Sequence, residues 1–357
     1  MRTALGRHRV HEHEASKSRF PAVVEKCGFT MKILVTGSSG HLGEALVRTL
    51  QGTTHEVVGL DRTVSPFTER VGTITDRDFV RQCMQGVDAV IHAATLHKPH
   101  LATHARQDFV ATNITGTLNL LEEAASVGVS SFVFTSTTSA FGRTLMPPPG
   151  APAAWVTEDV RPVSKNIYGV TKTAAEDLCE VFHRLHRLAC LVLRTSRFFP
   201  EVDDDRAIRE AYDDSNVKAN EYLYRRVDLQ DVVDAHMLAL EKAPSIGFGR
   251  YIISATTPFQ PEDLADLRKN APQVVERRVP EYAVEYARLG WKMFPSIERV
   301  YVNERARLEL GWQPRYDFRR IIDCLRAGDA TRSPLARAVG SKGYHDHEFA
   351  DGPYPVA

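Results

Sequence analysis

The sequence predicts an α/β fold, a doubly wound parallel sheet with a smaller C-terminal lobe. From Met31 onward, short apolar runs alternate with segments of helical periodicity, the pattern of parallel strands joined by crossover helices. The glycine-rich turn VTGSSGHLG joins the first run to the first helical segment. A run of hydroxyl residues, TSTTS, stands where a later apolar run ends. Such sheets bind ligands at the carboxyl ends of their strands.

The apolar runs predict strands bounded by turn or polar residues. We expect these strands at 32–37, 55–61, 88–95, 131–137, 188–196 and 249–255. Apolar residues at helical spacing predict helices between them, at 41–51, 75–86, 112–128 and 166–186. The segment 225–242 is expected to be a strand that leads into a helix.

The rhythm changes after Pro200, where an acidic, strand-poor stretch begins. We therefore expect a nucleotide-binding domain at 31–200, to which 226–255 returns. A substrate-binding lobe would be built from 201–225 and 256–330, followed by a C-terminal tail at 331–357. Residues 1–30 are basic and have no apolar core, so we expect a disordered N-terminal extension and not a secretory signal.

Composition narrows the class of protein. Basic and acidic residues number 45 each, so no overall charge favours nucleic acid as a partner. The apolar runs are too short to span a membrane. Five dispersed cysteines without CxxC pairing favour reduced thiols and a cytoplasmic protein.

The glycine turn predicts a dinucleotide site of the Rossmann type. Glycine permits the tight turn and the close approach of pyrophosphate, and the helix N-terminus supplies N–H donors. Asp61 ends the second strand, where a carboxylate binds an adenosine ribose diol and repels the 2′-phosphate of NADP. We therefore predict NAD, with NADP as the alternative because Arg62 follows directly.

Tyr168 and Lys172, in YGVTK, lie one helical turn apart on the same face. A phenol with a pKa of about 10 is a poor base at neutral pH. A neighbouring ammonium group, together with an oxidised nicotinamide ring, is expected to favour the phenolate. The alternative for an isolated Y-x-x-x-K is a pair on a helix surface.

Taken in order, TGSSGHLG, Asp61, HAA, TNITGTLNLLEEA, FTSTTSAFG, YGVTK and LRTSRFF resemble the extended short-chain dehydrogenases/reductases. The resemblance is to the NAD-dependent epimerase/dehydratase group and covers about 31–240, with ELGWQP matching near the C-terminus. It implies catalytic roles for Thr137, Tyr168 and Lys172. It also implies these cofactor-binding residues: Gly37, Ser39, Gly40, His41, Leu42, Gly43, Asp61, Arg62, Ile74, Ala93, Ala94, Asn113, Ser136, Tyr168, Lys172, Phe198 and Phe199.

The resemblance also bears on the reaction. The family's dehydratases carry an Asp–Glu pair directly after the catalytic Thr, where this chain has Thr138 and Ser139. Neither hydroxyl is an acid or base near neutral pH, so dehydration is disfavoured. We expect hydride transfer to or from a hydroxyl or ketone carbon of a sugar-like substrate, with Tyr168 as acid/base. A homodimer that pairs the helices near Asn113 and Tyr168 is suggested by the resemblance alone.

The substrate is expected to be small. Only about two dozen residues separate Pro200 from Arg225, and their carboxylates would repel a diphosphate. A free sugar or sugar acid is therefore favoured. The alternatives are a nucleotide-sugar epimerase and, in another class, a non-catalytic NAD(P)-sensing protein. Substrate contacts are expected from Thr138, His97, Arg197, Asn220 and Arg226.

Two further sets of side chains suggest other kinds of site. Arg194 and Arg225 are further candidates for an anionic substrate group, with surface ion pairing as the alternative. His97, His100 and His104 have a spacing that zinc tolerates, but no acidic or cysteine ligand accompanies them. No metal is therefore predicted.

Overall fold

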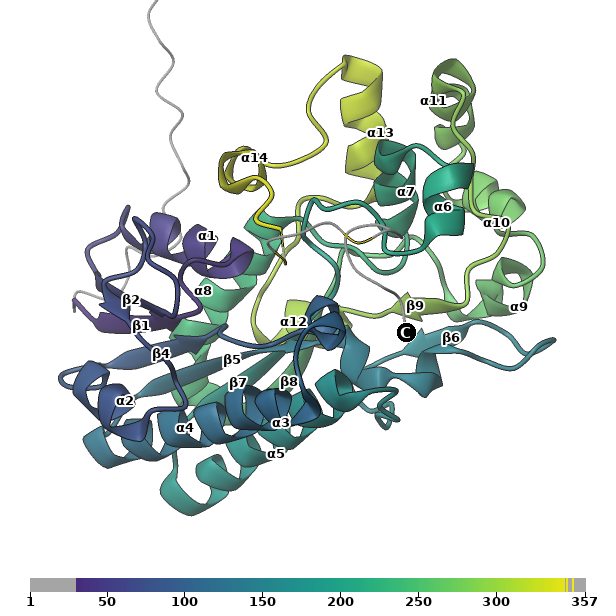
Figure 1. The fold of residues 1–357 in the computed structure, drawn as a ribbon. Helices are drawn as coiled ribbons and strands as arrows, with labels where there is room; N and C mark the ends of the chain where they lie inside the picture. The colour runs from purple at the N-terminus through teal and green to yellow at the C-terminus, as the bar shows by residue number, and fades with distance from the viewer. Residues whose placement is uncertain (1–29, 344, 346–348, 350–357) are drawn as a thin grey trace, which may run out of the picture. The chain divides into compact units, whose positions relative to one another are not determined.

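The computed structural model describes residues 30–343, 345 and 349. Seven strands form one sheet in the order β3-β2-β1-β4-β5-β7-β8, and every pair in it is parallel (Figure 1). They are β1 (Lys32–Thr36), β2 (Glu56–Asp61), β3 (Arg70–Val71), β4 (Ala89–His92), β5 (Ser131–Thr137), β7 (Cys190–Thr195) and β8 (Phe248–Ile253). After β1 the chain forms β2 and β3 on one side of β1, and it then returns to place β4 on the other side of β1. The predicted doubly wound parallel sheet is confirmed.

Helices cover both faces of this sheet (Figure 1). One face carries α2 (Arg77–Cys83), α3 (Arg106–Phe109), α4 (Gly116–Val127) and α5 (Ile167–His186), with the π-turn η2 (Val110–Thr115) leading into α4. The other carries α1 (His41–Leu50), α8 (Leu229–Ile246) and α12 (Glu304–Glu309). The core divides in the same way, because successive strand residues point to opposite faces. Ile33 and Val35 pack with α1 and α8, whereas Leu34 packs with α2 and α4.

A separate apolar cluster joins Ala153, residues within 217–224 and residues within 255–322. Its elements are α6 (Arg206–Ala211), α7 (Asp214–Glu221), η5 (Pro261–Asp263), α9 (Leu264–Leu267), α10 (Ala271–Arg278), α11 (Tyr282–Leu289) and α13 (Phe318–Ala327). A small parallel sheet of β6 (Ala154–Val156) and β9 (Arg299–Tyr301) borders this cluster. The assignment of this part to a substrate-binding lobe stays a prediction.

The structure differs from two local expectations and contains short strands that were not predicted. Residues 225–228 form no strand, since Arg226 makes only a single bridge to Arg197. The two-residue β3 and the β6–β9 sheet are too short to give a sequence pattern. In the predicted C-terminal tail at 331–357, α14 (Pro334–Val339) buries Ala336 and Val339 in the core cluster of α1 and α8, so this helix is part of the fold. Of the extension predicted at 1–30, residues 1–29 lie outside the described residues.

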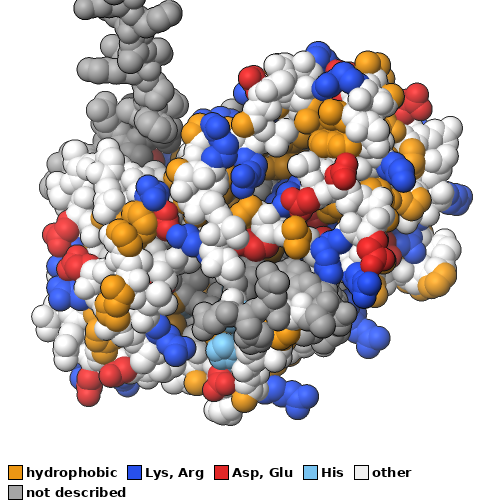
Figure 2. Space-filling model, turned by 45° about the horizontal axis from the view of Figure 1, so that its top comes forward, with side chains coloured by type: hydrophobic (Ala, Val, Ile, Leu, Met, Phe, Trp, Pro, Cys, Tyr) orange, Lys and Arg blue, Asp and Glu red, His pale blue; other side chains and the backbone are white. Residues whose placement is uncertain are grey.

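Figure 2 shows basic and acidic side chains mixed over the face that it presents, in line with the balanced composition. Across the described part of the chain, no helix has the length and apolar character needed to cross a membrane.

Candidate active site

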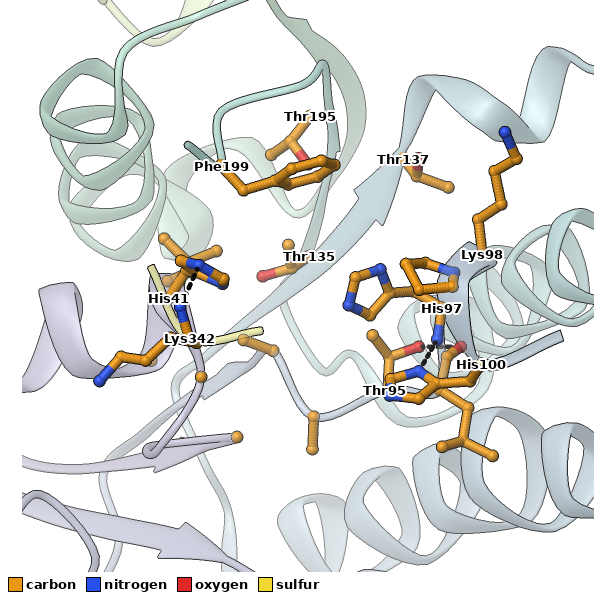
Figure 3. A pocket seen from close by; sticks show the side chains of 18 of the residues that line it. His41, Thr95, His97, Lys98, His100, Thr135, Thr137, Thr195, Phe199 and Lys342 are labelled. Carbon is orange, nitrogen blue, oxygen red and sulfur yellow. Dashed lines mark hydrogen bonds between the residues drawn. The ribbon is translucent and has the colours of Figure 1, made fainter. Parts of the chain in front are cut away.

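A cavity of about 850 Å³ opens at the carboxyl ends of the strands, next to the chain segments that follow β1 and β4 (Figure 3). Its walls come from the residues that follow β1, β2, β4, β5 and β7, and from the start of α5. The cavity brings together most of the predicted site residues. Those that line it are Gly37, Ser39, Gly40, His41, Leu42, Gly43, Asp61, Arg62, Ile74, Ala93, Ala94, His97, Ser136, Thr137, Thr138, Tyr168, Lys172, Arg197, Phe198 and Phe199.

At two positions of the glycine turn, the backbone has a conformation or a close contact that only glycine allows. Gly37 has a φ of +76°, and a Cβ on Gly43 would lie 1.8 Å from the Gly37 carbonyl oxygen. Helix α1 begins directly after this turn, and its N-cap, Gly40, has no side chain to occupy the first N–H groups. The backbone therefore leaves room and donors for a pyrophosphate at the start of α1.

Asp61 lies beside this turn at the end of β2. Its Oδ2 accepts a 3.1 Å hydrogen bond from Ser39 N, and its Oδ1 accepts a 3.0 Å bond from Thr63 N. These two bonds fix the carboxylate at the cavity wall. The position and orientation fit a ribose diol next to the pyrophosphate site, so the residues present fit a dinucleotide.

Tyr168 and Lys172 lie in the first turns of α5, which Asn166 caps by accepting a 3.1 Å hydrogen bond from Gly169 N. Tyr168 is 7% exposed and Lys172 is 3% exposed, yet both border the cavity. The Lys172 Nζ donates a 2.6 Å hydrogen bond to the carbonyl oxygen of Thr135 and lies 4.0 Å from the ring centroid of Phe134. The hydrogen bond from Lys172 to Thr135 thus joins the start of α5 to the end of β5 at the site.

Burial dominates the protonation of this pair. It raises the pKa of Tyr168 to about 12, although a hydrogen bond with Thr137 opposes the shift. It also lowers the pKa of Lys172 to about 7. The expected lowering of the tyrosine pKa by its lysine neighbour is therefore not found in the protein alone. The physical reason is that removing both groups from water disfavours the phenolate and the ammonium alike.

The hydroxyl residues at the end of β5 have different partners. Thr135 Oγ1 lies 2.9 Å from Nε2 of the buried His236, and Ser136 Oγ bonds to Glu176, which forms an ion pair with Arg194. Thr137 Oγ1 accepts a 3.0 Å bond from Ser139 N at the start of η3 (Thr138–Phe141). Of these hydroxyls, Thr137 is the one that acts on the pKa of Tyr168. The Ser136 side chain is directed toward the Glu176–Arg194 pair, although the residue borders the cavity.

Several predicted site residues lie away from the cavity wall. Asn113 is buried behind it, where its side chain bonds to both main-chain polar groups of Leu96 and to Thr171 Oγ1. It holds the loop after β4 against α5, next to Lys172. Arg194 is 3% exposed, and its guanidinium forms an ion pair with Glu176.

Asn220 and Arg226 also have structural partners. Asn220 is fully buried, donating to the Lys292 carbonyl oxygen and accepting from the Tyr286 hydroxyl. Arg226 donates to Glu221 and to the carbonyl oxygen of Phe199, so it supports the main chain of a predicted cofactor residue.

Arg197 lines the cavity within a dense ionic cluster. Its guanidinium contacts Asp203, Asp204 and Glu221, at N–O distances of 2.5, 2.9 and 2.9 Å. Lys98, Arg225 and Arg226 add further cations around the same carboxylates. Four cations thus face three carboxylates. Asp203 and Asp204 are ion-paired here, which reduces the repulsion toward a diphosphate that the sequence suggested.

The histidines after β4 lie on η1 (Lys98–Ala102) and beside it. His97 N donates a 3.0 Å bond to His100 Nδ1, and the rings of His97 and Tyr168 are 6.3 Å apart. Burial lowers the pKa of His100 to about 4 and that of His97 well below its usual range. Among the described residues, no group of three or more histidine, cysteine, aspartate or glutamate side chains could hold a metal ion.

A C-terminal strap, which we define as Gly340–Gly343 and His345, contributes to the cavity and was not predicted from the sequence. Glu201 Oε1 lies 2.8 Å from His41 Nε2 and accepts from Ser341 Oγ at 2.7 Å and from Lys342 N at 3.1 Å. The Lys342 Nζ contacts Glu44 on α1.

The far end of the strap reaches the other side of the cavity. His345 Nε2 lies 3.1 Å from the Pro99 carbonyl oxygen. His41 and Lys342 lie on the side of the cavity opposite His97 and His100 (Figure 3), so the strap reaches from one side to the other. The contacts of Ser341, Lys342 and His345 join parts of the chain that are distant in the sequence, so no local pattern marks the strap.

Arg299 and Tyr301 were missed as well. Both line the cavity from β9. No local pattern marks a three-residue strand that pairs with a segment some 145 positions earlier.

Comparison with known proteins now adds to this geometry. Residues 33–253, more than half of the chain, match the model of the NAD dependent epimerase/dehydratase family. The chain belongs to this family. The predicted resemblance is therefore confirmed, and NAD is the cofactor that the family's name assigns.

Two curated relatives of this epimerase/dehydratase family member show how far the similarity extends. An uncharacterized protein, y4nG of Sinorhizobium fredii, is 35% identical over 171 residues, which are 46% of this chain and 41% of that protein. A 3β-hydroxysteroid dehydrogenase/Δ5→4-isomerase of Mycobacterium tuberculosis is 25% identical over 337 residues, 82% of this chain and 89% of the relative. Relatives in the family include sugar epimerases, dehydratases and dehydrogenases.

Among solved structures, a short-chain dehydrogenase/reductase superfamily protein from Agrobacterium tumefaciens with bound NAD has a TM-score of 0.60 and 24% identity. The match covers 86% of this chain and 97% of that one, and it supports the shared fold. This epimerase/dehydratase family member therefore shares its fold with a structure that binds NAD.

Proposed function

We propose that this chain is an NAD-dependent oxidoreductase or epimerase that acts at a hydroxyl or ketone carbon of a sugar-like substrate, with a free sugar or sugar acid favoured. The observation that carries the proposal is one cavity that Thr137, Tyr168 and Lys172 share with the glycine turn and Asp61. A proton-transfer group, a hydroxyl that can bind the same oxygen and a dinucleotide cradle meet there.

NAD, when bound, supplies the hydride acceptor or donor. In the proposed mechanism, Tyr168 takes the proton from the substrate hydroxyl during oxidation and returns it during reduction. Thr137 holds the same substrate oxygen, since both residues line the cavity and the Thr137 hydroxyl acts to lower the pKa of Tyr168. Lys172 positions the cofactor ribose and links it to the end of β5 through Thr135.

The site favours reversible proton transfer over elimination. Thr138 and Ser139 stand in the positions where the family's dehydratases carry an acid/base pair, and both line the cavity. A hydroxyl side chain is too weak an acid or base near neutral pH to take a proton from carbon or to protonate a leaving hydroxyl group. We therefore propose a dehydrogenase, reductase or epimerase and not a dehydratase.

The short segment at 201–225 supports a small substrate. It contains α6 and α7, of six and eight residues, and no residue of either helix lines the cavity. Since Asp203 and Asp204 are ion-paired, charge alone does not exclude a nucleotide sugar, and a nucleotide-sugar epimerase remains the second candidate. A non-catalytic NAD-sensing protein would have no use for the Thr137–Tyr168–Lys172 set.

The test measures turnover of the full chain by NADH absorbance for dehydrogenation and by chromatography of the sugar products for epimerisation, which yields no net NADH, with four groups of compounds. These are free hexoses, hexuronates, hexose phosphates, and UDP- or dTDP-linked sugars, with a 3β-hydroxysteroid as a further arm. We expect turnover of free hexoses or their acids. Turnover of nucleotide sugars alone, or of the steroid alone, would overturn the proposed substrate class. NADH binding without turnover of any compound would favour the sensing protein.

The cytoplasmic location and the homodimer through α4 and α5 stay predictions. Sedimentation velocity tests the homodimer.

A further inference from the structure

Several basic side chains line the cavity, and their partners differ. Lys98, Arg197 and Arg225 are bound to carboxylates of the ionic cluster, Lys342 contacts Glu44, and Lys172 bonds to a main-chain carbonyl. Arg62 is exposed near Asp61, at the end of the cavity that fits the ribose. Arg299 differs from all of these because its side chain is only 18% exposed and still has almost no partner.

The guanidinium of Arg299 donates no hydrogen bond to any other residue in the described part of the chain. Its Nε is fully buried without an acceptor, and the nearest carboxylate oxygen, on Glu298, lies 4.0 Å from Nη1. A guanidinium carries five N–H donors, and leaving them unused away from water costs free energy. Such a group, bordering a cavity, is suited to bind a ligand that brings its own acceptors.

The position of Arg299 is set by β9. Arg299 and Tyr301 alternate with the fully buried Val300, so both face the cavity while Val300 faces the core. The Tyr301 ring stacks against Phe141, with centroids 6.4 Å apart. Phe141 ends η3, the turn that starts directly after Thr137. Arg299 therefore lies on the wall that continues from the proposed catalytic hydroxyl.

A second arginine is held close to the same wall. Tyr301 N donates a 3.3 Å hydrogen bond to the Tyr224 carbonyl oxygen. The Tyr224 ring has the guanidinium carbons of Arg225 and Arg299 at 5.4 and 5.9 Å from its centroid. The Nε of Arg225 is also buried without an acceptor, although its Nη2 is paired with Glu221. The local charge on this wall is thus positive.

We propose that Arg299 binds an anionic group of the substrate, a carboxylate or a phosphate, at the part of the cavity wall that β9 provides. This inference rests on the proposed function and names the residue that selects the substrate class. A planar guanidinium matches the paired oxygens of both anions. Arg299 takes the role that the sequence analysis gave to Arg197, because the three carboxylates around Arg197 already occupy its donors.

The test compares wild type with Arg299→Met and Arg299→Lys. Calorimetry of the full chain saturated with NADH measures binding of glucuronate, glucose 6-phosphate and glucose, and kinetics gives KM and kcat where turnover occurs. We expect wild type to bind one of the anions more tightly than glucose. Arg299→Met should reduce this preference about 10- to 100-fold, mainly through KM, and Arg299→Lys should retain part of it because the charge remains.

Arg320→Met is the matched control, since it removes a positive charge from the exposed surface of α13. Melting temperatures show whether each variant is folded. The relative affinities of glucuronate and glucose 6-phosphate decide between carboxylate and phosphate. Wild type that binds neither anion, or an unchanged preference in Arg299→Met, would overturn the inference. The turnover panel alone decides the proposed function, so the two can fail separately.

Discussion

The Nζ of Lys172 lies 2.6 Å from the carbonyl oxygen of Thr135, so the start of α5 is tied to the end of β5 inside the cavity. Lys172 is held by the strand whose end carries Thr137. This contact fixes the spacing between the proposed acid/base, Tyr168, and the hydroxyl that would share its substrate oxygen.

Replacing Lys172 by Met should impair both binding and turnover. The variant loses the amine that would contact the cofactor ribose, and a charge-assisted hydrogen bond contributes enough to raise the NADH dissociation constant about tenfold. NADH fluorescence titration measures this, with Lys242→Met on the exposed side of α8 as the control. Unchanged NADH affinity would place Lys172 in a purely structural role.

The pH dependence should differ between the two directions of the reaction. Burial raises the pKa of Tyr168 to about 12 in the protein alone, so the phenol is the main form at neutral pH. Oxidation needs the phenolate, whose fraction grows about tenfold per pH unit below the pKa, so the oxidation rate should rise with pH. Reduction needs the phenol and should stay level over the same range. Initial rates from pH 6 to 9 test this, and an oxidation rate that falls with pH would contradict it.

Asp61 should set the preference for NAD over NADP. Its carboxylate is fixed by two main-chain N–H groups at the cavity wall, so it cannot turn away easily from a 2′-phosphate. Asp61→Ala should tighten NADP binding about tenfold and weaken NAD binding. Asp78→Ala, at an exposed position on α2, is the control. Wild type that prefers NADP would show that Arg62 dominates the pocket.

The C-terminal strap should slow the exchange of the cofactor. Glu201 accepts hydrogen bonds from Ser341 and from the main chain of Lys342, and Glu201→Ala removes both. We expect faster NADH release in stopped-flow fluorescence and easier proteolysis near residue 341. Glu210→Ala on the exposed surface of α6 is the control. An unchanged release rate would mean that the strap does not limit exchange.

The fold and the centre of the site could be predicted because their signals are local. Strand runs, the glycine turn and the one-turn spacing of Tyr168 and Lys172 each lie within a few residues. The strap could not be predicted, since Lys342 and Glu44 are 298 positions apart. Arg197 looked suited to a substrate anion because the carboxylates around it are brought close only by folding. Arg299 depends on β9, which is too short to give a pattern.

Tyr168→Phe is the most direct test of the account, because it removes one hydroxyl and little binding surface. We expect kcat to fall about 10²- to 10⁴-fold while the NADH dissociation constant stays unchanged. Tyr212→Phe, which alters a tyrosine outside the cavity lining, should keep full activity. Near-normal turnover by Tyr168→Phe, on the best substrate of wild type, would contradict the proposed acid/base role.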